Sequence, residues 1–206
     1  MTLIDTHCHL NFNTFADDLN EVLQRASQAG VSRILVPGSD LPTSYQAVEM
    51  AERYPFIYAA VGIHPNDAHT WDANSLRQLE ELARHPRVVA IGEIGLDFYR
   101  DLSPREAQYQ AFHAQMQLAA ELHLPVVIHC REAYDELLAV LSEYPAVRGA
   151  LHCFSGNAEQ AQRGLELGYF LGIGGVITFK SAESLREIVR AMPRNRLLLE
   201  TDAPYL

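Results

Sequence analysis

The sequence predicts one α/β domain folded as a TIM (β/α)8 barrel. Three observations lead to this prediction: short apolar runs recur at roughly even intervals, amphipathic stretches separate them, and polar residues close several of the runs. Strands that alternate with helices indicate a parallel sheet joined by crossovers, and eight such strands fit a closed barrel. An open doubly wound sheet is the alternative, but it would scatter polar residues that a barrel gathers at one mouth.

The predicted strands are short and rich in Val, Ile and Leu, and glycine, proline or polar residues border them. In chain order they cover residues 3–10, 32–39, 56–65, 88–97, 125–130, 149–154, 169–178 and 196–204.

The intervening stretches carry helix start and stop signals. Residues 17–30 place apolar side chains at helical spacing, and Gly30 suits the position after the last helical residue. Residues 103–123 form the clearest helix, for which we expect Ser103 to be the N-cap and Glu106 to close a capping box.

The helix over residues 158–167, with Asn157 as its expected N-cap, is one of seven predicted helices. Eight strands require eight helices in a complete barrel, and the sequence ends at Leu206, directly after the eighth strand. We therefore expect residues 1–206 to be a single barrel domain that is C-terminally incomplete, lacking the last helix. A partner chain in an oligomer covering the open side of the barrel is the other expectation.

Composition narrows the class of partner. Among 206 residues the formal net charge is -10, and Lys180 is the single lysine among 16 basic residues. This balance excludes a broad basic surface for a long duplex but permits short or single-stranded ends. The sequence shows no secretory or membrane-spanning pattern, and three cysteines without framework spacing are typical of a reducing compartment, so we expect a cytoplasmic protein with no membrane partner.

Polar residues close apolar runs at the expected carboxyl ends of six strands, and the chemistry that needs such a set is binuclear metal hydrolysis. Imidazoles and carboxylates bind divalent ions such as zinc, manganese or magnesium, and two such ions activate water. Glu93 is central in the strand order and is therefore the natural bridging ligand. The set comprises His7, His9, His64, Glu93, His129, His152 and Asp202.

Each cysteine directly follows one of these histidines. Successive side chains of a strand point to opposite faces, so His7 and His9 are expected to face the site and Cys8 to face away. The same alternation predicts that Cys130 and Cys153 pack outward.

Further carboxylates lie close to the set. Asp5 and Glu200 have the strand parity of the expected ligands, and each either orients a histidine or satisfies backbone donors. Asp97 and Tyr99, in "GLDFY", are weaker candidates, because an Asp after a Gly-rich strand end is as often a turn residue.

The motifs "DTHCHL", "VGIHP", "GEIGLDFY", "IHCR", "HCFSG" and "LLETDAP" occur in this order along the chain. With them the sequence resembles the TatD family of metal-dependent hydrolases, the TatD-type deoxyribonucleases of the amidohydrolase superfamily. The resemblance implies that Asp202 acts as general base and that His64 contacts the substrate phosphate. Arg131, beside His129, is a further candidate phosphate contact, and a solvated charge at the rim is the alternative for it. The resemblance also implies a first metal ion on His7, His9, Glu93 and Asp202, and a second on Glu93, His129 and His152.

Lysine usage separates this chain from relatives that bridge their metals with a carboxylated lysine, because Glu93 takes that position here and Lys180 lies far along the chain. The predicted function is hydrolysis of phosphodiester bonds, as a deoxyribonuclease on DNA ends or on small phosphodiesters. Two alternatives stay open: amide or ester hydrolysis in the same site, and a non-catalytic, truncated metal-binding scaffold.

Overall fold

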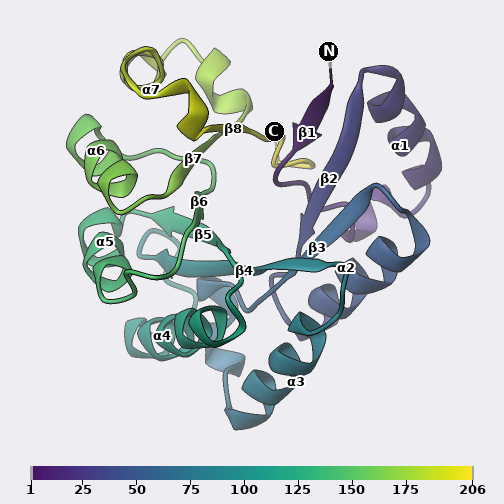
Figure 1. Cartoon of the computed structure of the whole chain (residues 1–206), viewed down its shortest axis with the longest axis horizontal. Helices are drawn as coiled ribbons and strands as arrows, with labels where there is room; N and C mark the ends of the chain where they lie inside the picture. Colours follow the sequence, from purple (N-terminus) through teal and green to yellow (C-terminus); the bar gives the residue numbers. More distant parts are fainter. Residues whose placement is uncertain (1, 206) are drawn as a thin grey trace.

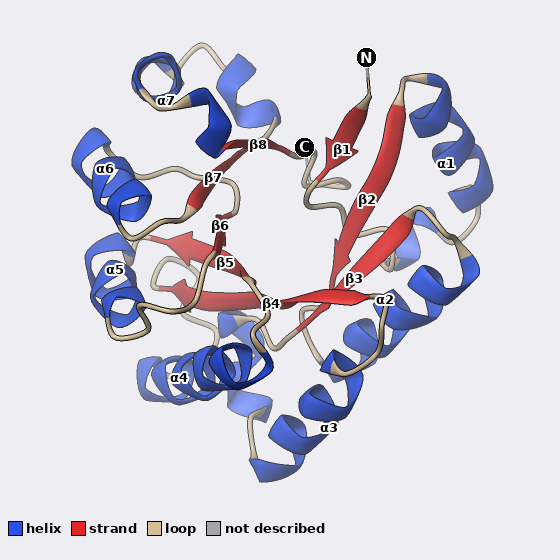
Figure 2. Ribbon diagram, viewed as in Figure 1, coloured by secondary structure: helices blue, strands red, loops and turns tan. Residues whose placement is uncertain are grey.

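The computed structural model describes residues 2–205 as a barrel of eight parallel strands surrounded by helices (Figures 1 and 2). Neighbouring strands pair in sequence order from β1 to β8. This confirms the predicted fold class. The strands are β1 (Leu3–Asp5), β2 (Val31–Pro37), β3 (Ile57–Val61), β4 (Val88–Asp97), β5 (Val126–Arg131), β6 (Gly149–Leu151), β7 (Phe170–Ile173) and β8 (Leu197–Leu199).

Seven α-helices within residues 2–205 alternate with these strands and lie outside them (Figure 2). Their apolar faces join the strands in one large hydrophobic core, as amphipathic helices on a buried parallel sheet must. The helices are α1 (Leu19–Gln28), α2 (Leu41–Arg53), α3 (Ala73–Ala83), α4 (Arg105–Leu122), α5 (Tyr134–Ser142), α6 (Ala158–Glu166) and α7 (Glu183–Ala191).

Two of the three expected helix boundaries are confirmed, and one is wrong. Gly30 follows the end of α1 with a φ of 92°, and the side chain of Asn157 caps α6 together with Gln160. Ser103 does not cap α4, which begins after Pro104 without a side-chain cap. The hydroxyl of Ser103 instead donates to the carbonyl of Asn66 at 2.7 Å, so a contact with a distant loop displaces the local cap.

Beyond β1 the chain closes the barrel between β2 and β8. β1 ends at Asp5, earlier than predicted, because the backbone N–H groups after it donate hydrogen bonds alternately to β8 and to β2. Thr6 N donates to Leu199 O at 3.0 Å, whereas Cys8 N donates to Leu35 O at 3.1 Å. The C-terminal end of the described chain consequently lies beside β1 (Figure 1).

The outer side of this seam is less covered than the rest of the barrel. Ile4 is 46% exposed and Leu199 50% exposed, and no helix follows β8 within the described part of the chain. The partner chain expected to cover this side stays a prediction.

Close packing of β4 on β5 positions the centre of the barrel mouth. Nearly every residue of β4 is buried, and Gly95 adopts a φ of 144°. A Cβ at Gly95 would collide with the carbonyl oxygen of His129, so only glycine permits this approach.

Candidate metal centre

The seven candidate ligand and catalytic side chains converge at the carboxyl ends of the strands. They come from six different strand ends, which only the closure of the barrel brings together. In chain order they are His7 and His9 after β1, His64 after β3, Glu93 in β4, His129 in β5, His152 after β6 and Asp202 after β8.

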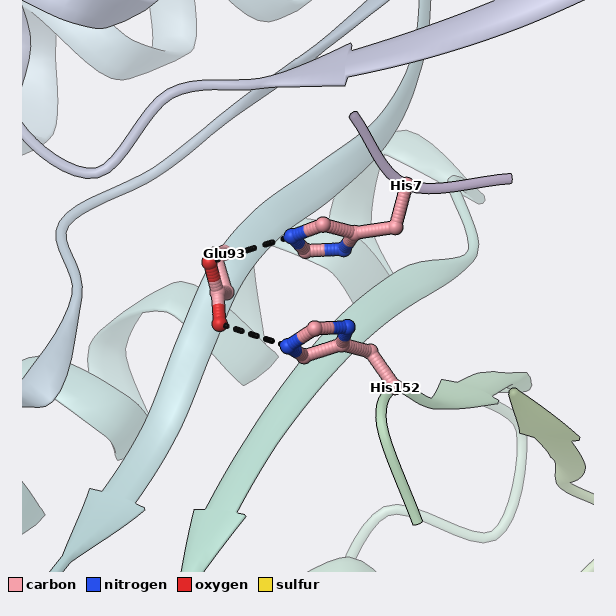
Figure 3. A group of neighbouring side chains, drawn as sticks. All are labelled: His7, Glu93 and His152. Atoms are coloured by element: carbon pink, nitrogen blue, oxygen red, sulfur yellow. Dashed lines mark ion pairs between the residues drawn. The ribbon is translucent and has the colours of Figure 1, made fainter. Parts of the chain in front are cut away.

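Glu93 lies at the centre of this cluster, and its two carboxylate oxygens face different histidines. Oε2 lies 3.4 Å from His7 Nε2, while Oε1 lies 3.3 Å from His152 Nε2 (Figure 3). On the same two sides, Oε2 is 3.6 Å from His9 Nε2 and Oε1 is 3.0 Å from His129 Nδ1. Glu93 therefore divides the cluster into two groups that share one carboxylate.

The first group has the dimensions of a tetrahedral metal site. With zinc–nitrogen distances of about 2.0–2.1 Å, two ligands of a tetrahedral ion lie about 3.3 Å apart. The Nε2 atoms of His7 and His9 are 3.1 Å apart, and they lie 3.7 and 3.6 Å from Asp202 Oδ1. His7, His9 and Asp202 thus form a group that could hold a metal ion, and Glu93 Oε2 lies 3.4 and 3.6 Å from the two imidazoles.

In the second group, a carboxylate lies beside the ring nitrogen of each histidine that faces away from Glu93. Asp97 Oδ2 lies 3.3 Å from His129 Nε2, which leaves Nδ1 directed at Glu93. Glu200 Oε1 lies 3.4 Å from His152 Nδ1, on the side opposite Glu93. A hydrogen-bonded carboxylate such as Asp97 fixes the ring orientation and tautomer of a metal-binding histidine. The Glu200–His152 contact is an ion pair, because His152 Nδ1 has no hydrogen-bond partner among the described residues.

Burial opposes the charges of this cluster, but the neighbouring groups decide the ionisation of Glu93 and His152. Burial disfavours the Glu93 carboxylate, yet the surrounding imidazoles, His152 first, hold its pKa well below the ordinary range. Burial also disfavours a charged His152, but Glu93 and Glu200 raise its pKa well above the ordinary value.

For His9 and His64, burial outweighs the attraction of the Glu93 carboxylate, so both imidazoles favour the neutral form. Burial lowers the pKa of His9 to about 4 and that of His64 to about 3. His64 Nδ1 accepts a hydrogen bond from Asn66 N at 3.1 Å, so the proton of the neutral ring lies on Nε2. Nε2 points into the site, 3.7 Å from Glu93 Oε1, and is available as a donor.

Asp5 and Asp97, two of the carboxylates expected near the ligand set, accept hydrogen bonds from the backbone. Asp5 accepts from His7 N at 3.2 Å and from Thr201 N at 3.0 Å, so it satisfies backbone donors at the seam rather than a histidine ring. Asp97 is a turn residue, whose Oδ1 accepts from Tyr99 N at 3.0 Å, and its Oδ2 also lies 3.3 Å from His129 Nε2, a contact that the sequence did not predict.

Arg131 lies at the rim of the mouth and is exposed, with its guanidinium carbon 4.1 Å from the ring centroid of Tyr99. Arg131 and Tyr99 are separate candidates in the sequence, and their stacking was not predicted. No local pattern reports it, because the two residues come from different strand ends.

The outward packing of the cysteines is confirmed for two of the three. Cys8 and Cys130 are buried in the hydrophobic core. Cys153 is partly exposed and lies beyond the end of β6 with a φ of 43°, so the alternation of a strand does not set its direction. All three thiols are free.

Comparison with known proteins gives the family to which this chain belongs. A family model described as "TatD related DNase" matches residues 4–206. The chain belongs to the TatD family. Of the helices that the structure describes, none has the length and apolar character needed to cross a membrane.

Individual TatD family members match over nearly the whole chain. The metal-dependent hydrolase YabD of Bacillus subtilis, itself called uncharacterized, is 46% identical over 206 residues, which are 99% of this chain and 81% of YabD. The 3′-5′ ssDNA/RNA exonuclease TatD of Klebsiella pneumoniae is 45% identical over 207 residues, with 99% of this chain and 79% of the relative covered.

A solved structure shows the same fold. The crystal structure of YjjV, a TatD homolog from Escherichia coli, superposes with a TM-score of 0.93 at 41% identity, covering 98% of this chain and 79% of that one. The histidines and carboxylates at the barrel mouth are groups able to bind metal, as expected in a family with metal-dependent hydrolases.

Proposed function

We propose that this TatD family member is a metal-dependent phosphodiesterase that removes nucleotides from accessible ends of DNA. The observation that carries the proposal is the division of the ligand cluster by Glu93, whose two oxygens face separate groups of histidines. The exonuclease name of the TatD relative of Klebsiella pneumoniae supports a nucleic-acid substrate.

The chain's residues fit two divalent ions, zinc, manganese or magnesium. Bound ions of this kind polarise a phosphoryl oxygen and lower the pKa of water. The first would be held by His7, His9, Glu93 and Asp202, and the second by Glu93, His129 and His152.

Asp202 is the residue best placed to accept the proton of the attacking water. Its side chain is only 15% exposed, and its Oδ1 lies 3.7 Å from His7 Nε2 and 3.6 Å from His9 Nε2, so a water at this group lies within its reach. The backbone holds it in position, because Asp202 N donates to His7 O at 2.9 Å.

His64 and Arg131 are the proposed phosphate contacts. His64 presents Nε2–H into the site, which suits a non-bridging phosphoryl oxygen of the substrate. Arg131 is exposed at the rim, where its guanidinium can meet the phosphate next to the scissile one. Asp97 and Glu200 would act indirectly by orienting His129 and His152.

Charge favours an end over an interior stretch of duplex. The chain carries a formal net charge of -10, so it lacks the electrostatic attraction that proteins use along double-stranded DNA. A strand end needs only a local set of contacts at the mouth. The three free cysteines fit a reducing compartment, and we place the protein in the cytoplasm.

The test is an assay of metal-reconstituted protein against a 5′-labelled single-stranded oligonucleotide, bis(p-nitrophenyl) phosphate and an aminoacyl ester, with Glu93→Ala as the inactive control. We expect stepwise shortening of the oligonucleotide, turnover of the small phosphodiester, and little ester hydrolysis. Faster hydrolysis of the ester would favour the amide or ester hydrolase. Metal binding without turnover of any substrate would favour the scaffold.

A further inference from the structure

Tyr99 is an aromatic side chain held in place although most of its surface is open. It is 57% exposed, and its backbone N donates to Asp97 Oδ1 at 3.0 Å. The guanidinium of Arg131 covers one face of the ring, at 4.1 Å from the centroid. A ring that a guanidinium covers on one face while most of its surface stays open offers its other face for stacking.

This pair lies directly beside the metal centre. Asp97, which fixes the backbone of Tyr99 through Oδ1, faces the ring of His129 through Oδ2 at 3.3 Å. Arg131 is paired with Asp97 in the register of β4 and β5, and Phe98 N donates to Arg131 O at 2.9 Å. Tyr99 and Arg131 are therefore anchored on the same two strands that carry Glu93 and His129.

The neighbourhood leaves room for a ligand on the far side of Arg131. Arg131, Ser155 and Asn157 line a hollow of about 440 Å³ between the loops that follow β5 and β6. The hollow also carries the carboxylates of Glu132 and Asp135, so it does not attract anions by charge alone. Tyr99 does not line this hollow, so a base stacked on the open face of Tyr99 lies outside it.

We propose that Tyr99 and Arg131 form a base-stacking subsite for the nucleotide that adjoins the scissile phosphodiester of a single strand. The base lies on the open face of Tyr99, and the guanidinium of Arg131 keeps the ring upright while it meets the adjoining phosphate. Aromatic rings bind unpaired bases in this way with little sequence preference. In a duplex the faces of the base are already stacked, so the subsite favours single-stranded ends. This inference rests on the proposed function and adds to it a selectivity for unpaired bases.

The test compares Tyr99→Ala with Tyr99→Phe, which keeps the ring. Loss of one stacked base weakens binding by about 5- to 150-fold. We expect Tyr99→Ala to raise the KM for a single-stranded oligonucleotide by that factor, relative to bis(p-nitrophenyl) phosphate, with Tyr99→Phe close to the parent. Tyr45→Ala is the matched control, because Tyr45 is 42% exposed on α2 and touches none of these residues.

A second experiment uses an oligonucleotide that has an abasic nucleotide next to the scissile bond. The abasic nucleotide is expected to raise the KM of the parent protein by the same factor and to have no further effect on Tyr99→Ala. Equal losses on the oligonucleotide and the small phosphodiester would overturn the inference, because they would show that Tyr99 acts only through Asp97 and His129.

Binding of a fluorescent single strand to the metal-loaded protein separates this inference from the proposed function, since it needs no turnover. A parent protein that turns over no phosphodiester refutes the proposed function. Unchanged affinity in Tyr99→Ala refutes the stacking subsite, whatever the activity.

Discussion

Asp97 and His129 form a partly buried carboxylate–imidazole pair, with 3.3 Å between Oδ2 and Nε2, and the other ring nitrogen of His129 faces Glu93. Asp97→Asn keeps an oxygen for the turn but loses the charge that favours the Nε2–H tautomer. We expect the affinity for the second ion to fall by about 10- to 100-fold. Chelator competition measures it, and unchanged affinity for both ions would contradict the role of Asp97.

Glu93 faces both groups of histidines, and we expect Glu93→Ala to remove both of the proposed ions. Elemental analysis of the reconstituted variant should show almost no bound metal, against about two ions per chain in the parent. Glu52→Ala is the matched control, because Glu52 pairs only with His85 at the surface. A Glu93→Ala variant that retains one full ion would reject the shared ligand.

We expect the loss of the Asp202 carboxylate to lower kcat much more than it weakens binding of the second ion. Asp202→Asn removes the proton acceptor while Glu93, His129 and His152 remain, so we expect kcat to fall by about 100- to 10,000-fold with that ion retained. Turnover and metal content are measured on the same preparation. Near-normal turnover would rule out Asp202 as the base.

The metal-free protein should become less stable as the pH rises. Burial disfavours the charged form of His129, but Asp97 and Glu93 raise its pKa, and that of His152 is raised further. Their protonated forms stabilise the fold fully below the unfolded value of about 6.5, and this contribution is lost as the pH rises through the folded values.

Urea unfolding between about pH 6.5 and 8.5, with chelator and with saturating zinc, measures this dependence. With zinc the trend should reverse, because metal binding displaces these protons and strengthens as the pH rises. Rising stability of the metal-free protein over this window would contradict the assignment.

Asp5 joins the two ends of the barrel, because its carboxylate accepts from His7 N, Thr201 N and, at 2.7 Å, the Thr201 hydroxyl. Asp5→Ala leaves these donors without a partner, so we expect a loss of about 3 kcal/mol in the free energy of unfolding. Denaturant titration measures it. Asp18→Ala, which breaks only the exposed pair with Arg25, is the control and should change stability little.

The order of strands and helices and the position of the site at the strand ends could be predicted from the sequence. Apolar periodicity is local, so it indicates each element, and parallel topology places all carboxyl ends at one mouth. The alternation of side chains likewise directed His7 and His9 inward and Cys8 into the core, as the structure shows.

The tertiary structure decided which side chains meet. Asp5 contacts Thr201 across 196 positions of the sequence, Ser103 leaves its expected cap for Asn66, and Arg131 stacks on Tyr99 from the next strand. No local pattern carries these pairings, because they depend on strand register and on the closure of the barrel. The fold and the kind of chemistry therefore follow from local sequence patterns, whereas the division of the side chains around Glu93 and the shape of the rim arise only when distant strand ends are brought together.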